Sequence, residues 1–263
     1  ADVRENFLHR PFISGSGVYE TIISALYNAI LLIDLSWLPK RFNNSQAVNY
    51  LSGGTVKTSI DEMHEEIERV TQGGFHGYKI RLDFRDNESI SDRVKLLNES
   101  SIPFAIDMIL NTNFKKWQSL DYVKIFDNLE TDNLLWIEEP VFPYAPLEWA
   151  DVITPLKMRK LPVAIGESLN SALELYSVIA SDIFDVIQID SSHNGNFLQL
   201  VELQDFALRN SQKVGYHNWG SIVTLFMNAI LNNLLSNEAY FEIPAFTTEF
   251  DLNLCNNLDL PVN

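Results

Sequence analysis

Acidic side chains stand at the ends of several short apolar runs in this sequence, where they could bind a cation or move a proton. The clearest case is the run 134–137, which leads into two adjacent glutamates, Glu138 and Glu139, and then a proline that stops the strand. Charges are seldom placed beside a buried strand unless a cation or a reaction needs them there. Asp107 and Glu167 end the neighbouring apolar runs. Because clustered carboxylates repel one another, the pattern predicts a cation between them.

The chemistry of these carboxylates also indicates which cation would bind. Ligand sets made only of oxygen select a hard ion, and a few protein ligands with open positions favour Mg²⁺. We therefore expect Asp107, Glu138 and Glu167 to bind Mg²⁺, with Glu139 as a neighbour of the site. A lone Glu-Glu-Pro is more often a solvated strand end, so this prediction depends on the three acids lying in register.

Charged or ionisable residues also occur on other predicted strands: the second carries Lys79 and Arg81, the sixth and seventh end in Asp190 and His217, and the last carries Glu242. Asp190 and His217 suit a carboxylate that orients an imidazole, with the histidine as general acid or base near neutral pH. Lys79 and Arg81 alternate in an apolar strand, so both lie on one side of it and could bind an anionic substrate or its developing charge. Glu242 could serve the site or simply lie on the rim. The other histidines are interpreted as structural or surface residues: His9, His64, His76 and His193.

The scaffold that must position these residues is predicted to be a ring of alternating strands and helices. The strands are short apolar runs without clean polar alternation, which is typical of parallel strands buried on both faces. From Asp107 onward the strand-end residues are spaced by 31, 29, 23, 27 and 25 residues, one strand–helix unit each. Strands are expected at 47–51, 78–82, 104–110, 134–137, 163–166, 185–189, 213–216 and 240–243.

Eight such units predict an α/β fold, a closed (β/α) barrel of the TIM type. Helices are expected at 59–72, 91–99, 116–129, 147–158, 171–180, 197–210 and 222–235. A doubly wound open sheet is the rival, but no glycine-rich phosphate loop follows an early strand. In a barrel the strand-end residues all lie on one rim, where such enzymes carry their chemistry.

Length, charge and cysteine content narrow the class of protein. A chain of 263 residues can bury a core of barrel size. Its formal charge of −16 argues against nucleic acid and anionic membranes as partners. The single cysteine, Cys255, and the absence of a signal-like start favour a reducing cytoplasm. The apolar segment 18–38 is long enough to span a membrane, but three polar residues interrupt it, so we expect a buried helix.

The strand-end motifs resemble, in order, those of the enolase superfamily, and the Asp–His pair points to its mandelate racemase subgroup. The resemblance covers about residues 18–250. It rests on Lys79-Ile80-Arg81, Asp107, Trp136-Ile137-Glu138-Glu139-Pro140, Gly166-Glu167, Gln188-Ile189-Asp190 and His217.

The resemblance implies a role for each of these residues. Asp107, Glu138 and Glu167 would bind Mg²⁺, which holds a substrate carboxylate and stabilises the enediolate formed when the α-proton leaves. His217, oriented by Asp190, would be the general base or acid. The substrate carboxylate would be contacted by Lys79 and Glu242. Assembly into a homo-oligomer is also implied.

Two residues depart from the family pattern. Arg81 stands where a second lysine base is often found, and arginine stays protonated at working pH. Racemisation with two bases is thereby put in doubt, whereas one histidine on one face can still dehydrate an acid sugar, an aldonate or aldarate. A racemase or epimerase of a 2-hydroxy acid and a non-catalytic barrel remain alternatives. Ile109 replaces a residue that is often polar.

Of the N-terminal capping domain that the resemblance implies, we expect only the last helix in this sequence. We expect residues 1–46 to be the remnant of an N-terminal α+β capping domain with its last helix, and residues 47–250 to be the catalytic barrel. Residues 251–263 are expected to start a C-terminal capping segment. Because caps supply much of the specificity, the sequence leaves open which acid sugar is used and whether the chain is a fragment.

Overall fold

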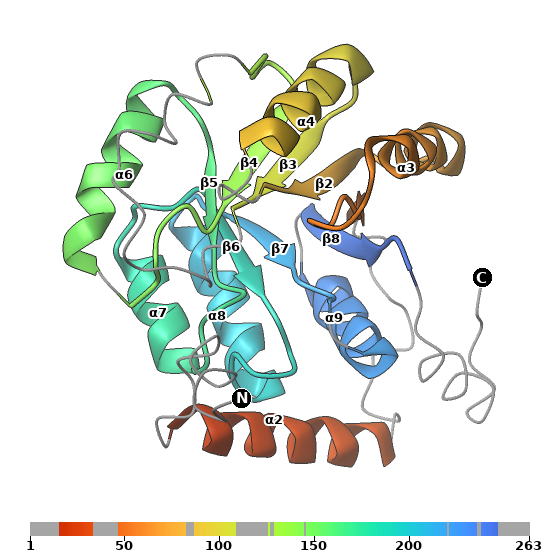
Figure 1. Cartoon of the computed structure of the whole chain (residues 1–263). Helices are drawn as coiled ribbons and strands as arrows, with labels where there is room; N and C mark the ends of the chain where they lie inside the picture. The colour runs from red at the N-terminus through yellow and green to blue at the C-terminus, as the bar shows by residue number, and fades with distance from the viewer. Residues whose placement is uncertain are drawn as a thin grey trace, which may run out of the picture.

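Eight parallel strands close into a barrel, as the sequence predicts (Figure 1). The computed structural model describes residues 16–33, 47–82, 87–108, 126, 129–144, 146–219, 221–235 and 238–246. Each strand pairs in parallel with the next, and the last pairs with the first. The strands are β1 (Ala47–Ser52), β2 (Gly77–Arg81), β3 (Phe104–Asp107), β4 (Leu134–Glu138), β5 (Val163–Ile165), β6 (Val186–Ile189), β7 (Lys213–Tyr216) and β8 (Ala239–Pro244).

Helices surround the barrel and connect consecutive strands (Figure 1). The helix expected at 116–129 falls almost entirely outside the described residues, and α4 begins four residues earlier than position 91. Residues 87–89 are all polar, so apolar periodicity could not reveal the start of the helix. The connecting helices are α3 (Ile60–Gly73), α4 (Asn87–Ser100), α6 (Pro146–Met158), α7 (Ala172–Ala180), α8 (Phe197–Arg209) and α9 (Ile222–Leu234).

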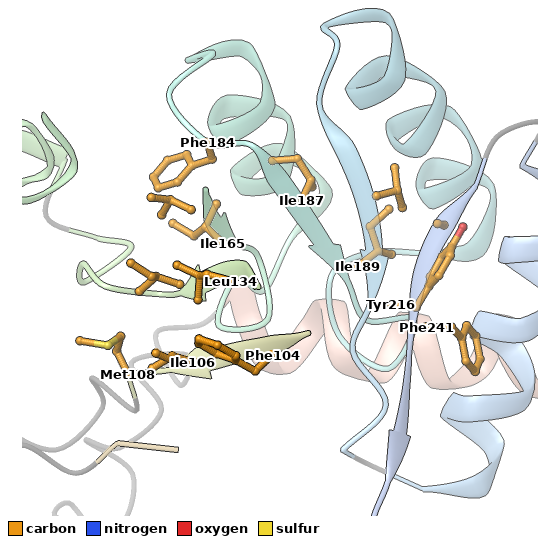
Figure 2. Packing of buried hydrophobic residues seen from close by; sticks show 14 of the residues in the cluster. Phe104, Ile106, Met108, Leu134, Ile165, Phe184, Ile187, Ile189, Tyr216 and Phe241 are labelled. Carbon is orange, nitrogen blue, oxygen red and sulfur yellow. The ribbon is translucent and has the colours of Figure 1, made fainter. Parts of the chain in front are cut away.

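Side chains along each strand alternate between the barrel interior and the helix layer. Ile137 packs in the larger hydrophobic cluster, whereas its neighbour Trp136 belongs to a smaller cluster with Tyr50 and Tyr240. Figure 2 shows part of the larger cluster, including Ile187 on β6. This period of two is the reason that every second residue near a strand end can face the interior of the barrel.

Residues 18–33 of the apolar segment lie in helix α2 (Ser16–Ile33), and for these residues the prediction of a buried helix is wrong. Ile22, Leu26 and Ile30 are 54%, 54% and 63% exposed. Apolar content alone predicted burial, yet it does not say which face of a helix meets its neighbour. Within the described part of the chain, every helix is too short or too polar to span a lipid bilayer.

Polar side chains attach α2 to the barrel. Ser24 Oγ donates a hydrogen bond to the carbonyl of Gly195 at 2.7 Å, and Asn28 Nδ2 donates to the carbonyl of Ser191 at 3.0 Å. Both side chains are buried. The helix therefore supports the loop that follows β6 (Figure 1). Of the expected capping regions, residues 1–15, 34–46 and 251–263 lie outside the described part, as does Ile109.

Candidate active site

The strand register brings the predicted site residues to one rim. Arg81 on β2 lies opposite Asp107 on β3, and Asp107 lies opposite Glu138 on β4. Glu167 follows β5, and His217 follows β7. All of them stand at the carboxyl ends of parallel strands, the end of a (β/α) barrel where catalytic residues gather.

Three carboxylates form a compact cluster on this rim. Oxygens of Asp107, Glu138 and Glu167 lie within 4.8 Å of one another, and this is the one such metal-compatible group among the described residues. Burial, together with the charges of Glu138 and Asp107, raises the pKa of Glu167 well above its usual value. The three carboxylates therefore repel one another, and a cation between them would relieve this repulsion. Because the cluster offers only oxygen donors, it fits Mg²⁺.

Lys79 is completely buried beside this cluster. Its Nζ lies 2.6 Å from Glu138 Oε1, 2.9 Å from Glu242 Oε1 and 4.0 Å from Glu167 Oε2. Burial alone would lower the pKa of Lys79, but Glu138 and Glu242 raise it. In return, although burial alone would raise the pKa of Glu138, Lys79 lowers it to about 2. Glu242 therefore belongs to the charged group of the site.

Arg81 is held in place by contacts on every side. Its Nη1 donates to Ser52 Oγ at 3.1 Å and to the carbonyl of Gly53 at 2.7 Å. Its Nε lies 3.2 Å from Asp107 Oδ2, and its Cζ lies 4.0 Å from the centre of the Trp219 ring. Burial alone would lower the pKa of Arg81, but Asp107 raises it, so this side chain keeps its proton.

Asp190 and His217 form a hydrogen-bonded dyad. His217 Nδ1 lies 2.7 Å from Asp190 Oδ2, and its Nε2 lies 3.3 Å from Glu167 Oε2. Burial alone would lower the pKa of His217, but the charge of Glu242 and the bond to Asp190 raise it. The pKa of Asp190 is lowered despite its burial, by His193 and His217. An imidazole oriented in this way can exchange a proton through Nε2.

Two residues that support Glu138 were not among the predicted site residues. Trp136 Nε1 and Gln188 Nε2 donate to Glu138 Oε2 at 2.9 and 2.8 Å. Both stand two positions before an acid, Glu138 or Asp190, and therefore on the same side of their strand. That spacing is the signal that could have identified them.

Glu139 holds the turn that carries Glu167. Its Oε1 accepts the backbone N–H groups of Gly166 and Ser168 at 3.2 and 2.9 Å, and Ser168 Oγ donates to its Oε2. Burial raises the pKa of Glu139 to about 7. These contacts direct Glu139 to the backbone around Glu167.

Comparison with known proteins identifies a family whose model matches most of this chain. A family model described as "Enolase C-terminal domain-like" matches residues 62–257. The L-talarate/galactarate dehydratase of Salmonella typhimurium is 24% identical over 166 residues, which cover 63% of this chain and 40% of that protein. The chain therefore matches less than half of the length of this curated relative.

Solved structures share the fold at low identity. The 3,6-anhydro-D-galactonate cycloisomerase from Zobellia galactanivorans matches with a TM-score of 0.72 and 20% identity, over 94% of this chain and 70% of that one. The L-talarate dehydratase from Polaromonas sp. JS666, complexed with Mg and L-glucarate, matches with a TM-score of 0.64 and 19% identity, over 84% and 60% of the two chains.

The fold and the site together define a (β/α) barrel with a carboxylate cluster and a His–Asp dyad on one rim. The chain belongs to the enolase C-terminal domain-like family, a part of the enolase superfamily, as its strand-end motifs predict.

Proposed function

We propose that the chain is the catalytic barrel of a Mg²⁺-dependent lyase that removes the proton α to a carboxylate and dehydrates an acid sugar. The observation that carries the proposal is the dyad of Asp190 and His217 next to the carboxylate cluster, with His217 Nε2 3.3 Å from Glu167 Oε2. The dehydratase relatives support the substrate class, an aldonate or aldarate.

The ligands for the cation are proposed to be Asp107, Glu138 and Glu167. When bound, Mg²⁺ would hold the substrate carboxylate and stabilise the negative charge that develops as the α-proton leaves. Lys79 and Glu242 are proposed to contact the same carboxylate, because Lys79 Nζ lies 2.9 Å from Glu242 Oε1 at the edge of the cluster.

His217 is proposed to act twice. Its Nε2 takes the α-proton while Asp190 accepts the hydrogen bond from Nδ1 and stabilises the imidazolium. The same proton then goes to the departing β-hydroxyl, which leaves as water. Arg81 keeps its proton and is bound on several sides, so no second base faces His217 from its position. A base on only one face of the substrate favours dehydration, because racemisation needs a second base to deliver a proton to the opposite face.

The test is NMR in D₂O with a pool of aldonic and aldaric acids, Mg²⁺ and either the unmodified chain or His217→Asn. We expect loss of an α-proton with formation of a dehydrated keto acid, slowed at least about 10³-fold in His217→Asn. The exposed His64→Asn serves as the matched control and should retain full turnover.

Two outcomes would contradict the proposal. Deuterium at Cα of recovered substrate with inversion would favour the racemase or epimerase. No exchange from folded protein saturated with Mg²⁺ would favour a non-catalytic barrel.

A further inference from the structure

Two residues with no part in the proposed chemistry, Ser192 and His193, link the backbone at Glu167 to Asp190 of the dyad. His193 Nε2 lies 2.7 Å from the backbone carbonyl of Glu167, and its Nδ1 lies 2.8 Å from Ser192 Oγ. Ser192 Oγ in turn donates to Asp190 Oδ1 at 2.5 Å. A chain of hydrogen bonds therefore runs from Glu167 through both side chains to Asp190, and on to His217.

The donor in each bond of this chain can be assigned, and His193 donates toward both of its ends. The carbonyl of Glu167 can only accept, so His193 Nε2 is the donor in that bond. The carboxylate of Asp190 also accepts the backbone N–H of Ser192 at 2.7 Å and a bond from His217 Nδ1. Because the serine has one hydroxyl hydrogen and gives it to Asp190, its oxygen can accept only from His193 Nδ1, an arrangement in which both ring nitrogens of His193 carry a hydrogen.

A second, parallel bridge joins the same two loops. Asn194 Oδ1 accepts the backbone N–H of Asp190 at 2.5 Å, while its Nδ2 donates to the carbonyls of Gly166 and Leu169 at 3.1 and 2.5 Å. Asn194 is completely buried. Asn194 joins only backbone groups of the two loops. The bridge through His193 and Ser192, by contrast, reaches the side chain of Asp190 in the dyad.

We propose that Ser192 and His193 are positioning residues that set the dyad and the Glu167 ligand relative to one another. The inference rests on the proposed function, because a base and a metal-bound substrate must be aligned only if the chain performs that reaction. Its geometry is independent of that function. Groups that orient a ligand typically change metal affinity 10–100-fold when removed.

The test uses Ser192→Ala, which breaks the link to Asp190, and His193→Leu, which breaks both links. His64→Leu, on the exposed face of α3, is the matched control. The first readout is the Mg²⁺ dissociation constant from calorimetry. The second, taken without metal, is the ¹H–¹⁵N resonance of His217 Nδ1–H, which reports its bond to Asp190.

We expect His193→Leu to weaken Mg²⁺ binding about tenfold or more and both variants to shift the His217 resonance. In the double variant, Ser192→Ala should add little, because the chain of hydrogen bonds is already broken.

Variants that match the unmodified protein in both readouts would overturn the inference. If the unmodified protein bound no Mg²⁺, the proposed function would fail, and the metal-free resonance would still decide whether the chain positions the dyad. Circular dichroism identifies a variant that does not fold, and Ser192→Ala then decides alone.

Discussion

At the scale of single residues, Arg81 is bound by partners on several sides of its guanidinium. Its guanidinium bonds to Ser52 and Gly53, lies beside Asp107 and stacks on Trp219. A planar fork with donors in several directions suits this position, whereas an ammonium is a compact charge that cannot reach all of these partners. Arg81 is therefore best understood as a residue that positions Asp107.

Replacing Arg81 by lysine keeps the positive charge but loses the planar, branched guanidinium group. We expect Arg81→Lys to lower the free energy of unfolding by about 1.5–3 kcal/mol, since buried bonds to a charged group are lost. Urea unfolding measures the change, and the exposed Arg159→Lys should leave the unfolding curve unaltered. Equal stability of the two variants would show that the contacts of Arg81 contribute nothing.

At the scale of elements, the turn after β5 decides where Glu167 points. Gly166 has a φ of 138°, which side chains rarely adopt, and an added Cβ would lie 2.1 Å from the carbonyl of Gln188 on the neighbouring strand. Glu139, the residue after β4, binds the same turn. The close approach of two backbones thus sets the direction of Glu167.

Gly166→Ala is expected to be severely destabilising, by more than about 3 kcal/mol, because strain and a backbone clash combine. Gly215→Ala on β7 is the matched control, since its added Cβ would meet neighbours at an ordinary 3.6 Å. We expect that variant to stay within about 1 kcal/mol of the unmodified protein. Thermal unfolding distinguishes the two, and similar losses from both would contradict the role of the turn.

At the scale of the whole molecule, the barrel concentrates negative charge that a cation can relieve. The chain carries a formal charge of −16, and three of its carboxylates lie within 4.8 Å of one another. A ligand that binds only the folded state stabilises it by mass action. Mg²⁺ should therefore raise the melting temperature of the barrel.

At 100 times its dissociation constant, Mg²⁺ should stabilise the protein by about 2.7 kcal/mol and raise the melting temperature by about 5–10 °C. Differential scanning fluorimetry with and without EDTA measures this. Glu138→Gln, which removes one proposed ligand charge, should largely abolish the Mg²⁺ effect. A shift of the same size in that variant would indicate binding elsewhere.

Much of the architecture was predictable because it depends on local pattern. Short apolar runs at one strand–helix spacing predicted all eight strands and the closed barrel. The residues of the proposed site could be identified for the same reason: strand ends of a parallel barrel share one rim, so Asp107, Glu138, Glu167 and His217 had to converge. Sequence thus determined the fold and the types of group on its rim.

Only the tertiary structure decided how those groups are bound to one another. His193 was interpreted as structural or surface, and α2 as buried, because a sequence does not show which loop a side chain meets or which helix face is covered. His193 reaches Glu167 from the loop after β6, and Asn28 brings α2 onto that loop by a polar face. Hydrogen bonds between distant segments have no periodic signal, since they depend on directions that exist only once the chain has closed.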